Sequence, residues 1–201
     1  MNKVEIANIA LNALGARRIS SLDDDTSEEA RTINMLYNPT LREIVSHYDW
    51  NSLIKRSRLA AVVGETLSIY SNCYQLPGDC SRVLSLLDPT TYDEMDRAKG
   101  VKLPERSDSH IFVREGDKLY TDVDGGIIKY VHIPSGTVPD AIGRVVSFRL
   151  AHESSIRLGR DVQLSKILEQ EFERLLLRAK AADNADSVSD NESVLDWSSF
   201  R

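Results

Sequence analysis

The sequence lacks any apolar run that could cross a membrane, because a membrane-spanning helix needs about 20 predominantly apolar residues. Near the N-terminus the apolar residues Val4, Ile6 and Ile9 are interrupted by Glu5 and Asn8. This interrupted pattern differs from the continuous apolar core of a signal peptide. We therefore expect neither a secretory signal nor a membrane span.

Cysteine and positive charge are also scarce. Cys73 and Cys80 are the two cysteines of the sequence, and without a histidine cluster nearby they do not make a zinc site, so we expect two reduced, structural thiols. The 201-residue chain has a formal net charge of −6 at pH 7, which argues against a protein whose whole surface binds nucleic acid. The length suffices for one substantial domain or two small ones.

Catalytic motifs are absent from the sequence. It contains no G-x-S-x-G, no glycine-rich phosphate loop and no H-E-x-x-H, which are common signatures of catalytic sites. His152 next to Glu153 could form half of an acid–base pair, but adjacent residues of a helix face different directions, so a histidine at the rim of the core is favoured. The other histidines are scattered at His47, His110 and His132. We expect a protein that is not an enzyme and that has no cofactor or metal site.

An acidic stretch, SLDDDTSEEA, occupies residues 21–30. A calcium loop is not expected, because no glycine follows Asp23–Asp25 and the two glutamates Glu28 and Glu29 come too early. Thr26 and Glu29 have the T-x-x-E spacing of a capping box, and acids in the first turn stabilise the positive end of a helix dipole. The stretch therefore predicts a helix that begins near Thr26.

A short basic stretch, Lys55-Arg56-Ser57-Arg58, is the one candidate nucleic-acid patch. Its only aromatic neighbour is Trp50. A solvated face or a salt bridge between subunits is the favoured interpretation.

Apolar periodicity predicts four helices. The first runs over residues 4–14 and ends at Gly15, and the second continues from Thr26 to Tyr48 with a kink or restart near Asn38, because Pro39 removes a hydrogen bond. The third and fourth cover residues 140–158 and 163–182. The last of these has its stripe at Leu164, Leu168, Phe172, Leu175, Ala179 and Ala182.

Between these helices the pattern changes to short strands separated by turn residues. Residues 58–63 and 66–70 are predicted to form a hairpin around Gly64-Glu65, and residues 88–110 a long loop. Further strands are expected at residues 74–76, 83–87, 111–113, 118–121 and 127–133. Glu115-Gly116-Asp117 is expected to join the strands 111–113 and 118–121 as a hairpin, and Asp124-Gly125-Gly126 to turn the chain into the last strand.

The sequence therefore predicts an α+β fold, a four-helix body built from N- and C-terminal helices with an inserted small antiparallel β-sheet domain. The helical body is assigned to residues 1–57 and 139–183, the inserted β-rich domain to 58–138, and an extended C-terminal tail to 184–201.

Four short motifs stand in order along the first part of the sequence. They are NALGARRISSLDDDTSEEA (residues 12–30), Tyr37-Asn38-Pro39, Asp49-Trp50-Asn51 and YQLPGDCSRV (residues 74–83). In their order and spacing they resemble the tail tubular protein A family, the head–tail connector (adaptor or gatekeeper) proteins of short-tailed bacteriophages. The closing helices and the tail agree with the family in layout more than in letters. The family usually has Pro where Asp49 stands, and an aromatic followed by Ala at residues 52–53.

This resemblance implies a structural protein of the virion tail, made in the host cytoplasm and located at the head–tail interface. Such adaptors form a ring of about twelve subunits that joins the portal protein to the tail nozzle protein, and DNA passes through its channel during genome ejection without specific binding. The family has no catalytic residues to carry over. Asp23, Asp24 and Asp25 become candidate acids of the lumen or of an interface.

The C-terminal tail is rich in Ser, Asp and Asn, yet it ends in apolar residues. Because exposed large apolar groups are a liability, we expect these residues to bind the portal, and a tail folded back onto its own core is the alternative. They are Val194, Leu195, Trp197 and Phe200. The alternative function is a small DNA-binding regulatory protein that uses the N-terminal helix pair, although the acidic first turn of the second helix would repel phosphates.

Overall fold

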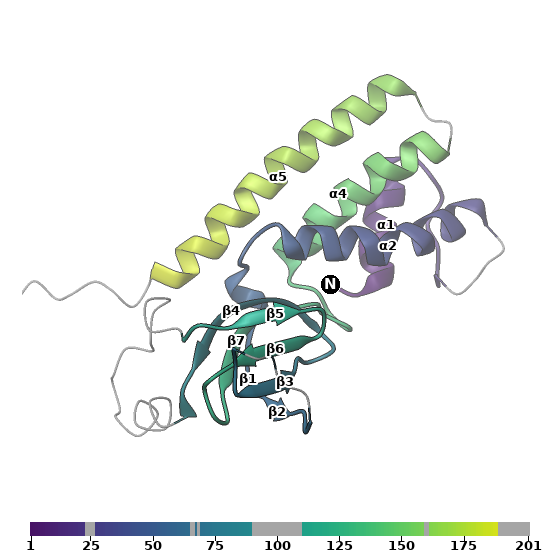
Figure 1. The fold of residues 1–201 in the computed structure, drawn as a ribbon. Coiled ribbons are helices and arrows are strands. Elements are labelled where there is room, and N and C mark those ends of the chain that lie inside the picture. Colours follow the sequence, from purple (N-terminus) through teal and green to yellow (C-terminus); the bar gives the residue numbers. More distant parts are fainter. Residues whose placement is uncertain (23–26, 65–66, 68, 90–109, 159–160, 189–201) are drawn as a thin grey trace, which may run out of the picture. The chain divides into compact units, whose positions relative to one another are not determined.

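The computed structural model describes residues 1–22, 27–64, 67, 69–89, 110–158 and 161–188. Within these residues the chain forms four α-helices and two small antiparallel sheets (Figure 1), which confirms the predicted α+β class. The chain divides into two compact units, a helical unit of residues 1–52 and 136–201 and a β unit of residues 53–135. The units therefore meet between residues 52 and 53 and between residues 135 and 136. The sequence placed these boundaries between residues 57 and 58 and between residues 138 and 139.

Helix α1 (Lys3–Ala13) begins with a capping box that the sequence reading missed. The Asn2 side chain accepts a hydrogen bond from the Glu5 N–H at 2.8 Å, and the Glu5 carboxylate accepts one from the Asn2 N–H at 2.7 Å, so two otherwise unpaired donors are satisfied. The helix ends before Gly15, whose φ of +64° is readily adopted by glycine.

Helix α2 (Glu28–Ser46) has Ser27 as its N-cap. The Ser27 hydroxyl accepts a hydrogen bond from the Ala30 N–H at 3.1 Å. The capping box predicted from the sequence placed the N-cap at Thr26, one residue before the observed N-cap. A capping box built on Ser27 would need Glu or Gln at position 30, whose side chain accepts a hydrogen bond from the N-cap N–H. Ala30 has no such acceptor. Thr26 and Asp23–Asp25 lie outside the described residues.

Pro39 lies inside α2, and of the kink or restart predicted near Asn38 the restart is wrong, because the helix is continuous from Glu28 to Ser46. A proline removes one backbone hydrogen bond. The apolar stripe is buried on both sides of it, with Ile33 and Tyr37 before and Leu41 and Ile44 after, each at most 4% exposed. Burial of this stripe offsets the lost hydrogen bond and keeps one helix.

Helix α4 (Asp140–Arg157) is the centre of the helical unit and contacts α1, α2 and α5. Its buried residues include Val146 and Leu150, which are both fully inaccessible. Arg149 of α4 links its neighbours, since its guanidinium lies 3.2 Å from the carboxylate of Glu43, 2.9 Å from that of Glu153 and 5.4 Å from the Phe172 ring centroid.

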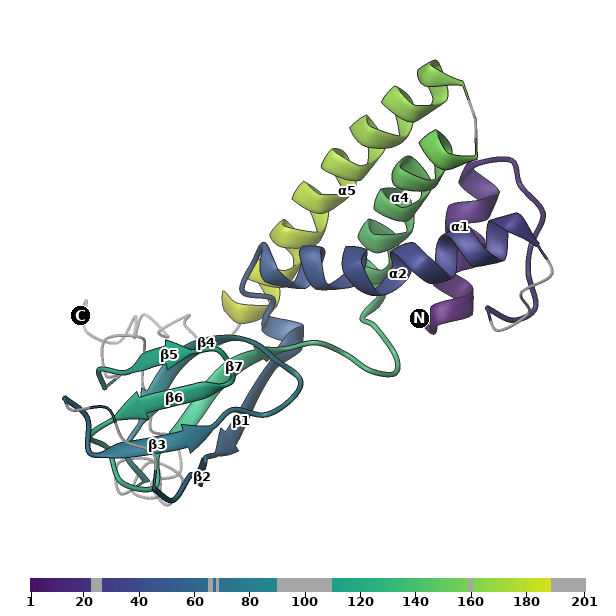
Figure 2. The same cartoon turned by 45° about the vertical axis from the view of Figure 1, so that its right-hand side comes forward.

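Helix α5 (Val162–Val188) is longer than predicted, because it continues past Ala182 to Val188. It lies alongside α4 in both views (Figures 1 and 2). The first residues of the segment that the sequence assigned to an extended tail are thus helical.

The described residues of the β unit form seven strands in two antiparallel sheets. The strand orders are β1-β7-β4 and β2-β3-β6-β5. A short 3-10 helix, η1 (Asn51–Leu53), precedes the first strand. The strands are β1 (Ile54–Arg58), β2 (Ala60–Ala61), β3 (Asn72–Gln75), β4 (Cys80–Leu87), β5 (Val113–Glu115), β6 (Lys118–Thr121) and β7 (Ile127–His132).

The hairpin predicted for residues 58–63 and 66–70 is wrong. The chain passes from β1 of one sheet to β2 of the other at Leu59, whose N–H donates to the Gly126 carbonyl at 3.0 Å. Strand β2 then pairs with β3 rather than with residues 66–70. The expected hairpin between β5 and β6 is confirmed, as is the turn at Gly125, which has a φ of +66°.

The core of the β unit lies between the two sheets. Tyr74 is central to it, since its hydroxyl donates to the Val123 carbonyl at 2.9 Å and accepts from the Gly125 N–H at 2.7 Å. The buried members of this core are Leu59, Tyr74, Leu76, Leu86, Leu119, Val123, Ile128 and Tyr130. The unit therefore has an apolar core of its own, as an independent domain requires.

Candidate functional site

The part of the chain that the structure describes covers helix α5 on one side only. Among its described side chains, Leu168, Ala179 and Asp183 are buried, and the other apolar residues that face α4 are half-buried. Ile167 is 56% exposed and Leu177 is 69% exposed. A long helix with large apolar groups in solvent is a candidate surface for association.

The C-terminal part of α5 is held by an unusual buried acid. Asp183 is 9% exposed, and its carboxylate accepts hydrogen bonds from the Asn51 N–H at 2.7 Å and from the Ser52 N–H and hydroxyl at 3.3 and 3.2 Å. Its main-chain carbonyl accepts one from the Asn51 side-chain amide at 3.0 Å. Because a buried carboxylate is costly unless it is hydrogen-bonded, these contacts explain why it is tolerated.

Residues 48–52, which we call the linker segment, are fixed by further contacts. The Tyr48 hydroxyl donates to the Asn184 side chain, and the Lys180 ammonium lies 5.4 Å from the centroid of the Tyr48 ring. The Tyr48 and Trp50 rings meet edge to face at 5.0 Å, and the Trp50 indole N–H donates to the Ile44 carbonyl at 3.0 Å. The linker segment is thus held by α2 on one side and by α5 on the other.

The sequence analysis missed this arrangement because it ended the last helix at Ala182 and left Asp183 as the final residue of the helical body, next to the tail. One signal was present, since Asp183 follows Ala179 by four residues and so continues the apolar stripe of α5. An acid at a core-facing helix position indicates a buried partner. The identity of that partner was not readable, because Asn51 and Ser52 are 132 and 131 positions away.

The structure does not describe the candidate site residues named from the sequence. Asp23, Asp24 and Asp25 lie outside the described residues. So do the tail residues Val194, Leu195, Trp197 and Phe200.

His152 and Glu153 have separate partners. The Nδ1 atom of His152 lies 3.1 Å from the Ser165 carbonyl oxygen, and a carbonyl oxygen only accepts, so Nδ1 carries the proton there. It cannot also take a proton from the Ser165 hydroxyl, 3.3 Å away. Glu153 instead accepts from the Thr40 hydroxyl at 2.9 Å and pairs with Arg149. These contacts form no nucleophile–base pair.

The basic stretch of β1 is partly neutralised within the chain. The Lys55 ammonium lies 2.9 Å from Asp79, and the Tyr130 hydroxyl donates to the same carboxylate at 3.1 Å. Burial opposes ionisation of Asp79, but the hydrogen bonds from Lys55 and Tyr130 outweigh it and lower the pKa of this carboxyl. Burial and the nearby Asp79 charge raise the pKa of Tyr130 to about 12. Trp50 is 1% exposed and is no stacking platform.

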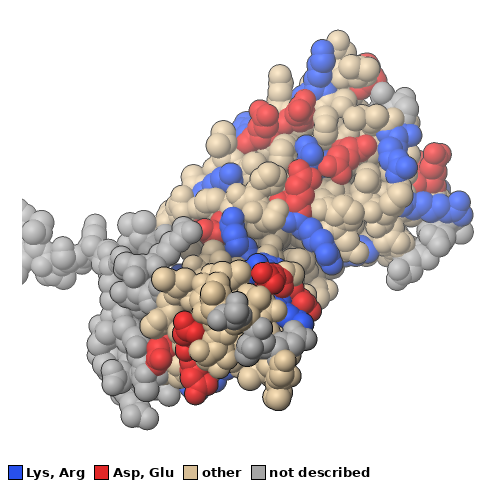
Figure 3. Space-filling view, in the orientation of Figure 1, with Lys and Arg blue, Asp and Glu red and all other residues tan. Residues whose placement is uncertain are grey.

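Charges of both signs are interspersed over the helical unit in the view of Figure 3, rather than gathered into one basic patch. Nucleic-acid binding proteins usually concentrate Lys and Arg on one face. The face of the helical unit that is visible in Figure 3 has no such concentration of Lys and Arg.

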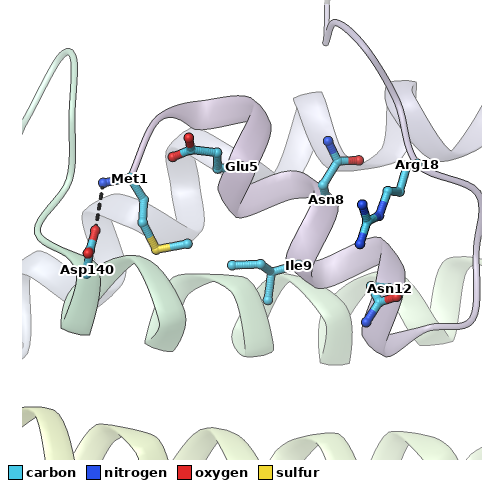
Figure 4. Close-up of a pocket in the computed structure, with 7 residues that line it drawn as sticks. All are labelled: Met1, Glu5, Asn8, Ile9, Asn12, Arg18 and Asp140. Carbon is cyan, nitrogen blue, oxygen red and sulfur yellow. Dashed lines mark hydrogen bonds and ion pairs between the residues drawn. The ribbon is translucent and has the colours of Figure 1, made fainter.

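Two open surface pockets give no indication of a catalytic site. The first, of about 560 Å³, lies beside α1 (Figure 4), where the Met1 ammonium is 3.0 Å from the Asp140 carboxylate and Asn8 is bonded to the backbone of Ile19. Its Arg18 is exposed. The second, of about 540 Å³, belongs to the β unit and includes His110. Neither one gathers a nucleophile, a base and an oxyanion donor.

Within the described part of the chain, no three His, Cys, Asp or Glu side chains are placed to hold a metal ion. The same residues include no helix that combines the length and apolar character of a membrane span. Both cysteines are free thiols, with Cys73 buried and Cys80 half-buried, and burial raises the pKa of Cys80.

The fold and contacts define an α+β protein of two compact units, in which hydrogen bonds of Asp183 join α5 to the linker segment. No family model matches the sequence, and no curated protein matches it significantly.

Proposed function

We propose that this protein is a structural head–tail adaptor of a tailed bacteriophage, and not an enzyme. In this role it forms a ring of about twelve subunits between the portal and the tail nozzle. The observation that carries the proposal is the ordered set of motifs, from Asn12 to Val83, that resembles the tail tubular protein A family.

The motif residues occupy positions that determine the local fold, which supports the resemblance. Gly15 ends α1 with its positive φ, and Leu14, Trp50 and Leu76 are buried, with at most 4% exposure. Asn51 makes two of the hydrogen bonds that hold Asp183. A resemblance at such positions indicates a shared fold rather than a shared catalytic activity.

The one-sided packing of α5 supports assembly into a ring. Ile167 and Leu177 expose apolar surface that the described residues of the chain leave uncovered. Lateral contacts in a ring are heterologous, so one surface of a subunit meets a different surface of its neighbour. We propose that α5 supplies one of these two surfaces.

The expected DNA behaviour follows from charge. A formal net charge of −6 per chain would surround a channel with negative potential. Non-specific DNA binding depends on Lys and Arg contacts to phosphates, so DNA would pass without being held. Binding of random duplex DNA at micromolar concentration and about 150 mM salt would favour the DNA-binding regulator instead.

The test is binding to purified portal rings of the same virion. The full chain should sediment with the portal, whereas a chain truncated after Asp186, which lacks Val194, Leu195, Trp197 and Phe200, should stay in the supernatant with an unchanged thermal melt. Binding by neither chain would contradict the proposal. Equal binding by both would remove the tail from the proposed interface, and a much lower melt of the truncated chain would favour a tail folded back on the core.

A further inference from the structure

The linker segment directly precedes the boundary between the two compact units, which lies between Ser52 and Leu53. We infer that Asp183 is a latch that holds the linker segment and so limits the directions in which the chain can leave the helical unit. The latch lies wholly within the helical unit and does not depend on the proposed function.

The first step concerns which donors Asp183 satisfies. Asn51 and Ser52 are the first residues of η1, and the first N–H groups of a helical turn have no partner inside it. A side chain of the preceding residues usually caps them. Here the acceptor comes from α5 instead, with both carboxylate oxygens used, Oδ2 by the Asn51 N–H and Oδ1 by the Ser52 N–H.

The second step concerns rigidity. Hydrogen bonds to an ionised group are stronger than neutral ones, and this carboxylate is 9% exposed, so water competes for it poorly. The Asn51 amide and the Ser52 hydroxyl add a bond each to Asp183. Four bonds to one residue fix both the position and the direction of the backbone at Asn51 and Ser52.

The third step concerns what else fixes the segment. The Trp50 indole holds the segment to α2 through Ile44, one residue before the latch begins. Without the Asp183 carboxylate, Trp50 would stay anchored while Asn51 and Ser52 lost their backbone partners. Release would therefore act at the boundary and leave the rest of the helical unit folded.

The matched variants are Asp183→Asn and Glu173→Gln. Asp183→Asn keeps the size of the side chain but removes its charge and one of its two acceptors. Glu173 is an exposed acid of the same helix, so Glu173→Gln makes the same change of charge without touching the linker segment. Ser52→Ala is a milder second variant that removes only the hydroxyl bond.

The experiment is hydrogen exchange at individual amides combined with small-angle X-ray scattering. In Asp183→Asn the Asn51 and Ser52 amides should exchange roughly tenfold faster or more, with α1, α2 and α4 unchanged, and the distribution of interatomic distances should broaden. Ser52→Ala should shift exchange in the same direction by less, and Glu173→Gln should match the unaltered chain.

Three results would overturn the inference. One is equal exchange at Asn51 and Ser52 in the two charge variants. Another is faster exchange throughout the helical unit of Asp183→Asn, which would make the residue a general stabiliser. The third is faster exchange at Asn51 and Ser52 with an unchanged scattering profile. The latch would then place no limit on the directions in which the chain leaves the helical unit.

Discussion

At the scale of single residues, the linker segment depends on two buried groups of opposite character. Trp50 contributes a large apolar surface and one hydrogen bond, whereas Asp183 contributes a charge that accepts several. Neither role was predicted from the sequence, because Trp50 was considered beside the basic stretch and Asp183 beside the tail. Both assignments depend on contacts between distant parts of the chain, and periodicity does not report such contacts.

Replacement of Trp50 should destabilise the protein strongly. Trp50 is 1% exposed, so Trp50→Ala removes a buried ring and should lower the free energy of unfolding by roughly 3–5 kcal/mol. Ile167→Ala is the control. Because Ile167 is 56% exposed, this replacement should change the free energy of unfolding by at most about 0.5 kcal/mol. Urea unfolding of both variants checks this, and similar midpoints for the two would contradict the assigned burial.

The β unit should lose stability in acid as Asp79 becomes protonated. Its pKa is lowered in the folded protein from an ordinary value of 3.8. A carboxyl with a depressed folded pKa stabilises the fold above its unfolded pKa, and this stability is lost as pH falls through the folded pKa. Because both partners are partly exposed to solvent, with the Lys55 side chain 48% exposed and that of Asp79 33% exposed, the contribution should stay below about 1 kcal/mol.

An NMR titration of the Asp79 carboxyl tests the cause of this shift. The midpoint should lie below 3.8 in the unaltered chain and rise in Lys55→Met, which removes the ammonium but keeps an apolar side chain of similar length. Identical midpoints in the two proteins would show that Lys55 does not lower the pKa of Asp79.

At the scale of elements, periodicity located the helices better than it located the strands. The stripe of α2 and the turns at Gly15 and Gly125 were readable because each depends on neighbours in sequence. The passage of the chain between two sheets at Leu59 was not readable, since it depends on pairing of β2 with β3 across a ten-residue connection, residues 62–71. The length of α5 was underestimated because its last turns are stabilised by contacts with the linker segment.

Helix α2 should become more stable without its proline. Pro39 is exposed inside a continuous helix, so Pro39→Ala restores a backbone donor and should raise the free energy of unfolding by about 1–3 kcal/mol. Thermal or urea unfolding measures the change, with the exposed Asn38→Ala as control. A less stable Pro39→Ala variant would mean that the ring is required by the packing of α2.

The exposed face of α5 should matter for assembly and not for folding. Leu177 is 69% exposed, so Leu177→Asp should change the free energy of unfolding by at most about 0.5 kcal/mol, yet it should prevent ring formation on the portal by placing a charge in an apolar contact. Glu173→Gln, on the same helix, should assemble normally. Rings of normal size formed by Leu177→Asp would exclude this part of α5 from the subunit contact.

At the scale of the whole molecule, two compact units are joined by short connections at residues 52–53 and 135–136. The described residues of each unit include its own buried apolar residues, while α5 retains uncovered apolar surface. Such a chain has the means to fold alone and a surface left for association. These features suit a component of a larger assembly, which is the role proposed for it.

Electron cryo-microscopy of the protein mixed with the portal of its virion tests the central claim most directly. The account predicts a closed ring of about twelve copies on the portal, with α5 at the contact between neighbouring copies and the chain after Val188 against the portal. Portal particles that carry no added density at saturating concentrations of the protein would contradict it.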